Sequence, residues 1–302
     1  MDFKRSPSAP LIALSLLMLV AFAASVAGIF VDSRTITGVP AWLKPAKFAI
    51  SIALYTGTLG WLLRYICIWP GFIRSMAWIV SITLLIEIVI IDVQAARGVT
   101  SHFNIATGLD QALFSTMGSA IVILWLASAG ILAALFRQKF VDPAWGWALR
   151  LGMLITIIGS ASGAFMLQPT RTQLSDARAQ HRMPSAGGHT VGGPDGGPGF
   201  PGLGWSTEHG DLRVPHFFGL HGVQMIPAMA WLIGRRRTRP VFIAAASYFT
   251  FVLILAWQAL RGESVFRPDS SVLSAFAIWA VVTLAAAIWV GRLQNPGVLS
   301  KA

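Results

Sequence analysis

Long apolar stretches separated by short polar segments constrain the fold of this chain more than any other feature. A helix needs about 20 apolar residues to cross about 30 Å of hydrocarbon. The stretches that reach this length lie near residues 10–31, 47–66, 75–96, 111–136, 146–167, 216–234, 240–260 and 271–291. Backbone polar groups must be satisfied internally in lipid, so such stretches form helices. The sequence therefore predicts an all-α, polytopic membrane helix bundle with eight transmembrane helices.

The first apolar stretch has a second interpretation, because Lys4 and Arg5 precede it and small residues lie near its end, as in a secretory signal peptide. Its apolar part is longer than the roughly 7–15 residues typical of a signal core. We therefore interpret it as the first transmembrane helix.

Composition agrees with a membrane protein. The chain of 302 residues is 55% hydrophobic and only 12% charged, which is more apolar material than a soluble core needs. A net charge of +11 would suggest nucleic acid in a soluble protein, whereas basic residues beside apolar spans are typical of cytoplasmic loops. We expect the lipid bilayer as a partner and no nucleic acid.

The single cysteine, Cys67, excludes an internal disulfide and a CxxC metal pair.

The distribution of basic residues predicts the orientation. Every second connection lies on the same side of the membrane as the two termini. That side carries most of the Lys and Arg residues near helix ends: Lys4, Arg5, Arg64, Arg74, Arg137, Lys139, Arg235, Arg236, Arg237, Arg239, Arg292 and Lys301. By the positive-inside rule this side is cytoplasmic. Both termini then lie inside, and segments 31–46, 97–110, 168–215 and 261–270 lie outside.

A short polar motif occurs twice. QAARG at 94–98 and QALRG at 258–262 are 164 residues apart, and each ends the third helix of a four-helix set. This spacing predicts a single membrane domain, 1–302, built from two tandem repeats, 10–138 and 145–292, in the same orientation. The alternative is coincidence between short motifs in apolar sequence of low diversity.

The repeated motif also predicts a ligand site at the outer face. Arg97 and Arg261 continue their helices at the interface, with Gln94 and Gln258 one turn below on roughly the same face. A guanidinium can hold phosphate or carboxylate through two parallel hydrogen bonds. Further positive charge comes from Lys44 and Lys47 at the start of the second helix. His102, in the connection after the third helix, is another candidate ligand-binding residue. The alternative is that these side chains only reach lipid headgroups.

The connection 168–215 breaks the symmetry of the two halves. It is rich in Gly and Pro, which favours a mobile flap or an extended cover over the outer face. Its far end, GDLRVPHFFGLHGVQ, is instead polar and adds four candidate ligand-binding residues: Arg213, His216, His221 and Gln224.

Two acidic residues lie within the third helix. Glu87 and Asp92 are costly in lipid, by about 2.5–3.5 kcal/mol on insertion scales, and are therefore functional candidates. Glu87 lies on the same face of this helix as Gln94, whereas Asp92 is turned by about 140° from Glu87. We predict a proton relay made of Glu87 and Asp92. An internal ion pair of Glu87 with Arg97 or Arg150 is the alternative.

The histidines raise the question of a metal or haem. His216 and His221 are five residues apart, about 140° around a helix, and do not form the i, i+4 pair of a helical zinc site. Eight helices in two halves resemble haem A synthase in architecture, a family with axial histidines in several helices of each half. Here the second, fourth and eighth helices contain no histidine. No cofactor is favoured, and one haem or metal on His102, His216 or His221 stays an alternative.

The motifs WLKPAKFAIS, QAARGVTSHFN and GDLRVPHFFGLHGVQ together resemble those of uncharacterised bacterial multipass membrane proteins. The resemblance covers most of the chain and implies the bacterial plasma (inner) membrane, but it carries no activity. From the residues we expect binding or transport of an anionic or amphipathic ligand at the outer face. The alternative is a membrane-embedded redox enzyme, or one dependent on metal or haem, so enzymatic activity is left open.

Overall fold

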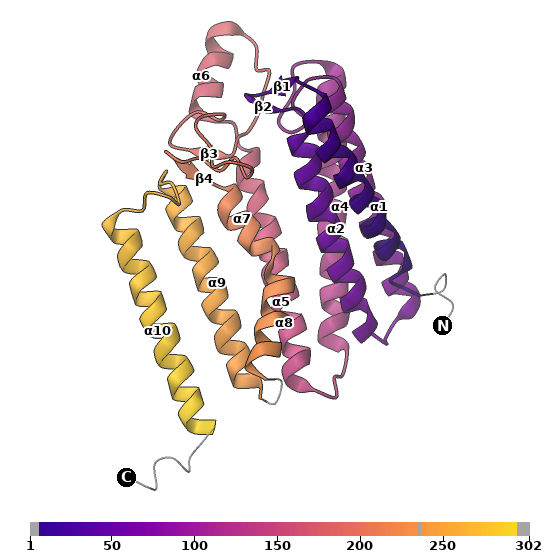
Figure 1. Cartoon of the computed structure of the whole chain (residues 1–302), viewed down its shortest axis with the longest axis vertical. Coiled ribbons are helices and arrows are strands. Elements are labelled where there is room, and N and C mark those ends of the chain that lie inside the picture. The colour runs from indigo at the N-terminus through magenta and orange to yellow at the C-terminus, as the bar shows by residue number, and fades with distance from the viewer. Residues whose placement is uncertain (1–5, 235–236, 295–302) are drawn as a thin grey trace. The chain divides into compact units, whose positions relative to one another are not determined.

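The structure, a computed structural model, describes residues 6–234 and 237–294, with the side chains of 291–294 excepted (Figure 1). Five basic residues used to predict the orientation, Lys4, Arg5, Arg235, Arg236 and Lys301, lie outside these ranges, as does the side chain of Arg292. The chain divides into two compact units. The first consists of Met1–Gln138 with Ala164–Gly188, and the second of Lys139–Gly163 with His189–Ala302.

The first unit is a bundle of long helices. Its helices are α1 (Ala9–Val31), α2 (Leu43–Leu62), α3 (Pro70–Ala96), α4 (Gly108–Arg137) and the short polar α6 (Arg171–Gln180). Helix α1 packs against α2, and α3 packs against α4. A 3-10 turn, Leu63–Tyr65, follows α2.

A hairpin joins α1 to α2. Its strands, β1 (Thr35–Ile36) and β2 (Val39–Pro40), are linked by Thr37 and Gly38, both at positive φ, as in the turn type that matches the twist of two strands. The guanidinium of Arg34 donates to Asp32 and to the carbonyl of Ala96 at the end of α3. With the indole of Trp42, this guanidinium holds the pKa of Asp32 below its ordinary value.

The second unit contains α5 (Pro143–Ala161), α7 (Arg213–Leu220), α8 (Gly222–Ile233), α9 (Thr238–Leu260) and α10 (Ser270–Gln294). Helix α5 packs against α7, α8 and α9, and α10 packs along α9 (Figure 1). A 3-10 segment, Ser162–Leu167, follows α5. The strands β3 (Thr190–Val191) and β4 (Gly210–Asp211) pair in antiparallel fashion.

Seven helices in the described part of the chain are long and apolar enough to cross a membrane. Their outer faces expose large apolar side chains, such as Val20 at 67%, Val122 at 58% and Val281 at 66%. In water such faces would be an aggregation liability, whereas lipid solvates them. The chain is therefore a helical integral membrane protein, as the apolar stretches predict.

The predicted sixth span, 216–234, differs from the other seven. It forms two shorter helices, α7 and α8, which are 8 and 12 residues long and meet at His221. Neither is long enough to cross a bilayer by itself. The number of eight continuous spans is therefore not confirmed.

The starts of the helices follow from local sequence. Pro70 and Pro143 stand at the first positions of α3 and α5, where a missing N–H costs nothing. The Asp142 carboxylate accepts from the N–H of Trp145 and so caps α5. Helix α6 begins with a reciprocal capping box between Thr170 and Gln173.

The connection 168–215 is held at specific points by both units. In the first unit, the N–H of Ala186 donates to the carbonyl of Phe103 at 2.9 Å, and the Gln173 side chain bonds the backbone of Gly187. In the second unit, the hydroxyl of Ser264 donates to the carbonyl of Ser206 at 2.8 Å, with both residues buried. The Gly-rich part of the connection thus has defined contacts.

Candidate functional site

The repeated QxxRG motif ends α3 and α9 in the same way. In α3, the N–H of Val99 donates to the carbonyl of Gln94 and the N–H of Gly98 to that of Ala95. The corresponding bonds at the end of α9 run from Glu263 to Gln258 and from Gly262 to Ala259. Gly98 and Gly262 have φ of 74° and 80°, which glycine adopts without strain. Both ends are Schellman caps.

The two glutamines of the motif lie inside their units rather than at the surface. Gln94 is 0% exposed and Gln258 is 1% exposed. Each donates its side-chain amide to the carbonyl six residues later, Gln94 to Thr100 at 3.5 Å and Gln258 to Ser264 at 2.8 Å. Each glutamine therefore fixes the loop that follows its helix.

The two arginines of the motif are both paired with acids. Arg97 bonds Asp110 at 2.6 Å and also donates to the side-chain oxygen of Gln94. Asp110 is 3% exposed and also accepts from Gln94 at 3.0 Å and from the Thr107 hydroxyl at 2.7 Å. These contacts connect the end of α3 to the start of α4.

Arg261 plays a corresponding part at the end of α9. It bonds Glu263 at 2.7 Å and Asp269, just before α10, at 2.6 Å. The N–H of Val272, bonded to Asp269, holds the pKa of this carboxyl below its ordinary value, and the charge of Arg261 acts in the same direction. Arg97 thus joins α3 to the start of α4, and Arg261 joins α9 to the start of α10.

The predicted relay residue Glu87 meets His102 in the first unit. His102 Nε2 lies 3.2 Å from Glu87 Oε1, and His102 Nδ1 lies 3.0 Å from Lys44 Nζ. The ring of His102 packs on Phe48. These contacts place His102 between an ammonium group and a buried carboxyl group.

Three further residues singled out from the sequence are Asp92, Lys47 and Arg150. Asp92 is half-buried on α3, and its Oδ1 is buried without a hydrogen bond to any described residue. Lys47 is half-buried near the start of α2. Arg150, offered as an alternative partner of Glu87, lies over the rings of Phe140 and Trp147 in the second unit.

The predicted residues around α7 take separate neighbours. Arg213 bonds Asp211 at 2.6 Å and donates to the carbonyl of Gly204. His216 Nδ1 lies 3.0 Å from the carbonyl oxygen of Gly159 and 3.3 Å from the Ser162 hydroxyl, at the end of α5.

His221 has different surroundings. Its ring packs edge-on against Phe217 at 4.4 Å between centroids, and its side chain is hydrogen-bonded to Gln224. His216 is thus held by the end of α5, whereas His221 lies at the junction of α7 and α8.

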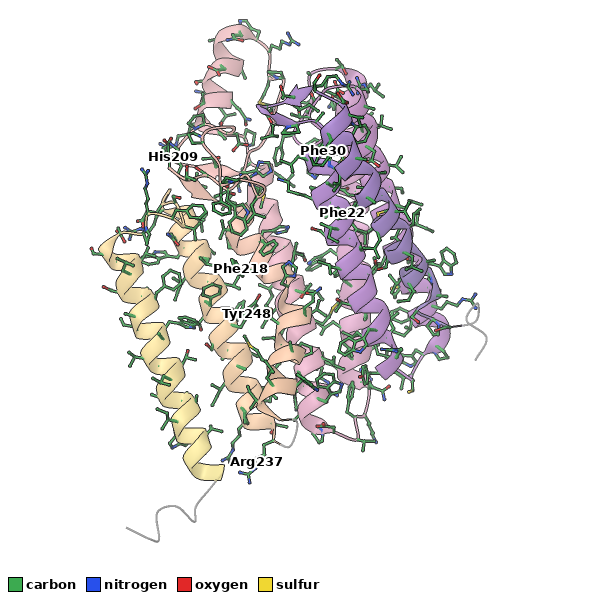
Figure 2. All side chains as sticks on the ribbon, in the orientation of Figure 1. Phe22, Phe30, His209, Phe218, Arg237 and Tyr248 are labelled. Atoms are coloured by element: carbon green, nitrogen blue, oxygen red, sulfur yellow. The ribbon has the colours of Figure 1, made fainter. Side chains whose placement is uncertain are left out.

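The break between α7 and α8 is held by two hydroxyl groups from neighbouring helices. Thr156 of α5 donates to the carbonyl of Leu220 at 3.1 Å and accepts from the N–H of Val223 at 2.8 Å. Tyr248 of α9 donates to the carbonyl of Phe218 at 2.6 Å, and both residues are labelled in Figure 2. Backbone groups freed by a broken helix must find such partners inside a membrane.

Glycines bring α5 into direct contact with the broken helix. A Cβ on Gly159 would lie 2.4 Å from the backbone of Gly219, and one on Gly152 would lie 2.8 Å from the carbonyl oxygen of Gly222. Small residues permit this close approach of helices in membranes. The approach places the Thr156 hydroxyl within reach of the break.

A cavity of about 840 Å³ lies on the other side of the break, between α8, α9 and α10. Its walls are apolar and aromatic, with a few polar side chains: Phe217, Phe218, His221, Met225, Met229, Ile233, Pro240, Ile243, Ala244, Ser247, Tyr248, Phe251, Trp279, Thr283, Ala287 and Val290. Pockets for small ligands have volumes of about 300–1,000 Å³ and linings of this kind.

No family model matches the chain. No curated protein or solved structure matches it either. Among residues 6–234 and 237–294, no group of three or more His, Cys, Asp and Glu side chains could hold a metal ion.

The structure brings some predicted residues together and adds others. It joins Gln94 to Arg97, His102 to Glu87, and His221 to Gln224. Gln94 and Arg97 belong to the first unit, and Gln258 and Arg261 to the second, so their meeting in one cleft stays a prediction. Sequence reasoning missed Asp110, Asp269, Thr156 and Tyr248. Pro227 and the glycines around His221 were the available signal for the break.

Proposed function

We propose that this membrane protein binds, and by virtue of its broken helix transports, a neutral amphipathic ligand in the cavity beside His221. The observation that carries the proposal is the cavity itself, which runs along α8 from the junction with α7. Discontinuous helices frame the binding sites of many membrane transporters, because irregular backbone is tolerated where it lines a cavity.

The lining indicates the chemistry of the ligand. Phe218, Phe251 and Trp279 offer aromatic surface to an apolar body. The His221 ring and the Tyr248 hydroxyl lie at the end of the cavity near the break and suit a polar head. Among the described residues the lining has no Lys, Arg, Asp or Glu, so the amphipathic alternative is favoured over an anionic ligand.

The arginines of the QxxRG motif support the same choice. Arg97 and Arg261 are both paired with acids, and their contacts account for loop closure without a ligand.

Trp205, in the long connection, packs on Phe217 and Phe218 at centroid distances of 5.5 and 6.3 Å. The connection therefore covers the end of the cavity nearest the break, and the ligand lies deeper than an outer-face site.

The proposal includes a topology. The segments α7 and α8, with His221 between them, would together cross about 30 Å and supply the eighth span of two tandem four-helix repeats. The basic connections then place both termini in the cytoplasm of a bacterial cell, with the protein in the plasma membrane.

Cysteine labelling in intact cells tests this topology. In a chain whose exposed Cys67 is replaced by alanine, we expect Ser185→Cys to react with a membrane-impermeant maleimide added outside. Thr238→Cys, at the start of α9, should react only after the cells are opened. Labelling in the reverse pattern would contradict the orientation.

Filling the cavity tests ligand binding. A long-chain alcohol carrying bromine should quench the fluorescence of Trp279 in a saturable manner, and Trp279→Phe should remove the quenched component. Ala244→Phe, in the cavity wall, is expected to weaken this binding at least about tenfold by occupying the site. The matched control is Ala246→Phe, because Ala246 is exposed on the same helix.

Three results would contradict the proposal. Equal binding by Ala244→Phe and wild type would show that the cavity is not the site. Tighter binding of the corresponding brominated carboxylate would favour an anionic ligand. A haem absorption band or a stoichiometric metal in the purified protein would favour the redox or metal-dependent alternative.

A further inference from the structure

Lys44, His102 and Glu87 form a continuous chain of polar contacts that the proposed ligand site does not use. The two links are 3.0 Å, from Lys44 Nζ to His102 Nδ1, and 3.2 Å, from His102 Nε2 to Glu87 Oε1. The His102 side chain is 24% exposed and that of Glu87 is 3% exposed. These contacts therefore lead from the partly solvated His102 ring to the buried carboxyl group of Glu87.

The contacts define which nitrogen of His102 carries the proton. A charged lysine can only donate, so Nδ1 accepts from Lys44. The proton of the neutral imidazole is then on Nε2 and faces the carboxylate of Glu87. His102 is thus positioned to receive a proton at one nitrogen and release another from the opposite nitrogen.

The position and burial of Glu87 suit the inner end of a series of proton-carrying groups. It lies nine residues before the last residue of α3, Ala96, or about 14 Å along the helix axis. Its second oxygen, Oε2, is buried and has no hydrogen-bond partner in the described part of the chain. An ionisable side chain at such a depth in a membrane helix is a functional candidate by default.

We propose that Lys44, His102 and Glu87 form a proton relay that loads the buried carboxyl group of Glu87 from solvent. The Lys44 ammonium passes a proton to Nδ1 of His102 as the proton on Nε2 moves to Glu87. One N–H bond breaks at Lys44, one breaks at Nε2, and new bonds form at Nδ1 and at the carboxylate. Lys44 regains a proton from water. His102 returns to its first tautomer when its ring turns toward solvent, gives the Nδ1 proton to water and takes a proton from water at Nε2.

The surrounding helices carry few other charged groups. Helix α1 has no charged residue along its length. On α2 the charged residues are Lys44 and Lys47, and Tyr55 is bonded to the Ser128 hydroxyl. On α4, Asp110 is held by Gln94, Arg97 and Thr107, and Arg137 ends the helix.

Asp92 lies on α3 itself, about 140° around the helix from Glu87. It therefore faces a different side of the helix. Among the described residues, His102 contacts Glu87, and Lys44 in turn contacts His102.

Infrared difference spectroscopy after a pH jump tests the relay in the purified full-length protein. After a drop from roughly pH 8 to 5, which spans the titration of imidazole, a carboxylic acid band should appear that Glu87→Gln abolishes. His102→Gln is expected to slow its appearance at least about tenfold, a modest loss for a positioned proton carrier. Lys44→Gln should also slow it. The control is His181→Gln, which should leave the rate unchanged, because His181 is exposed and is not one of the three relay residues.

Rescue separates a relay from a structural role. In His102→Gly, added imidazole should restore the rate, because it replaces the proton carrier. The relay is refuted if His102→Gln matches the wild-type rate, if imidazole restores nothing in folded His102→Gly, or if no Glu87 band appears. If the variants do not fold, the wild-type protein still tests the relay. On transfer to D₂O, exchange at the Glu87 carboxylic acid should shift its band at once. A band unchanged after hours refutes the relay.

Discussion

Gly159→Leu is expected to lower the free energy of unfolding by at least about 3 kcal/mol and to separate α5 from the broken helix. A Cβ at this position would lie 2.4 Å from both Cα and C of Gly219, and backbone atoms cannot rotate away as a side chain does. Overpacking in a well-packed interior usually costs about 1–3 kcal/mol, and a collision between backbones exceeds that range. Denaturation in detergent micelles measures the loss.

The matched control is Gly118→Leu. Gly118 also lies inside an apolar transmembrane helix, α4, but a Cβ there would meet nothing within 4 Å. Leucine favours the helix over glycine by close to 1 kcal/mol, so this variant should be at least as stable as wild type. Equal destabilisation by the two substitutions would mean that α5 and α7 do not pack through their glycines.

Hydropathy predicts the spans well, because the cost of unsatisfied backbone groups in lipid leaves helices as the only solution for long apolar stretches. It does not predict the break at His221, because hydropathy measures only how apolar a stretch is, and FFGLHGVQMIP belongs to an apolar stretch of spanning length. Tertiary contacts hold the break in place. Thr156 and Tyr248, distant in sequence, supply the hydrogen bonds that the helix gives up.

The QxxRG motif shows a different limit. Its recurrence is evident in the sequence, and it predicts equivalent ends for two helices. The glycine after each arginine already indicates a helix end, because it permits positive φ. The acids that pair with the arginines could not be predicted, because Asp110 and Asp269 lie at different distances along the chain from their partners.

The relay shows a third limit. The position of Glu87 inside an apolar helix is sufficient to mark it as a functional candidate. Its partner His102 lies in the next connection, and only the fold of that connection brings the ring back to the level of Glu87. Contacts of this kind depend on loop geometry, which residue spacing on one helix cannot describe.

Thr156→Val is expected to destabilise the protein by roughly 2–4 kcal/mol and to weaken binding in the cavity. Valine keeps the shape of the side chain but leaves the carbonyl of Leu220 and the N–H of Val223 without their partner. Each buried backbone group that loses its bond costs about 1–3 kcal/mol. Because Thr156 is 2% exposed, water cannot replace the hydroxyl. Denaturation in micelles and the quenching of Trp279 measure the two effects.

Thr83→Val in α3 is the control for this substitution. Thr83 is also buried, but its hydroxyl bonds only carbonyls of its own helix, at Ile79 and Val80. Such bonds add little to a helix, so Thr83→Val should change the stability by less than about 0.5 kcal/mol. If Thr156→Val were equally mild, the break between α7 and α8 would not depend on α5. A loss of stability with unchanged quenching would instead show that the break is structural and does not shape the ligand cavity.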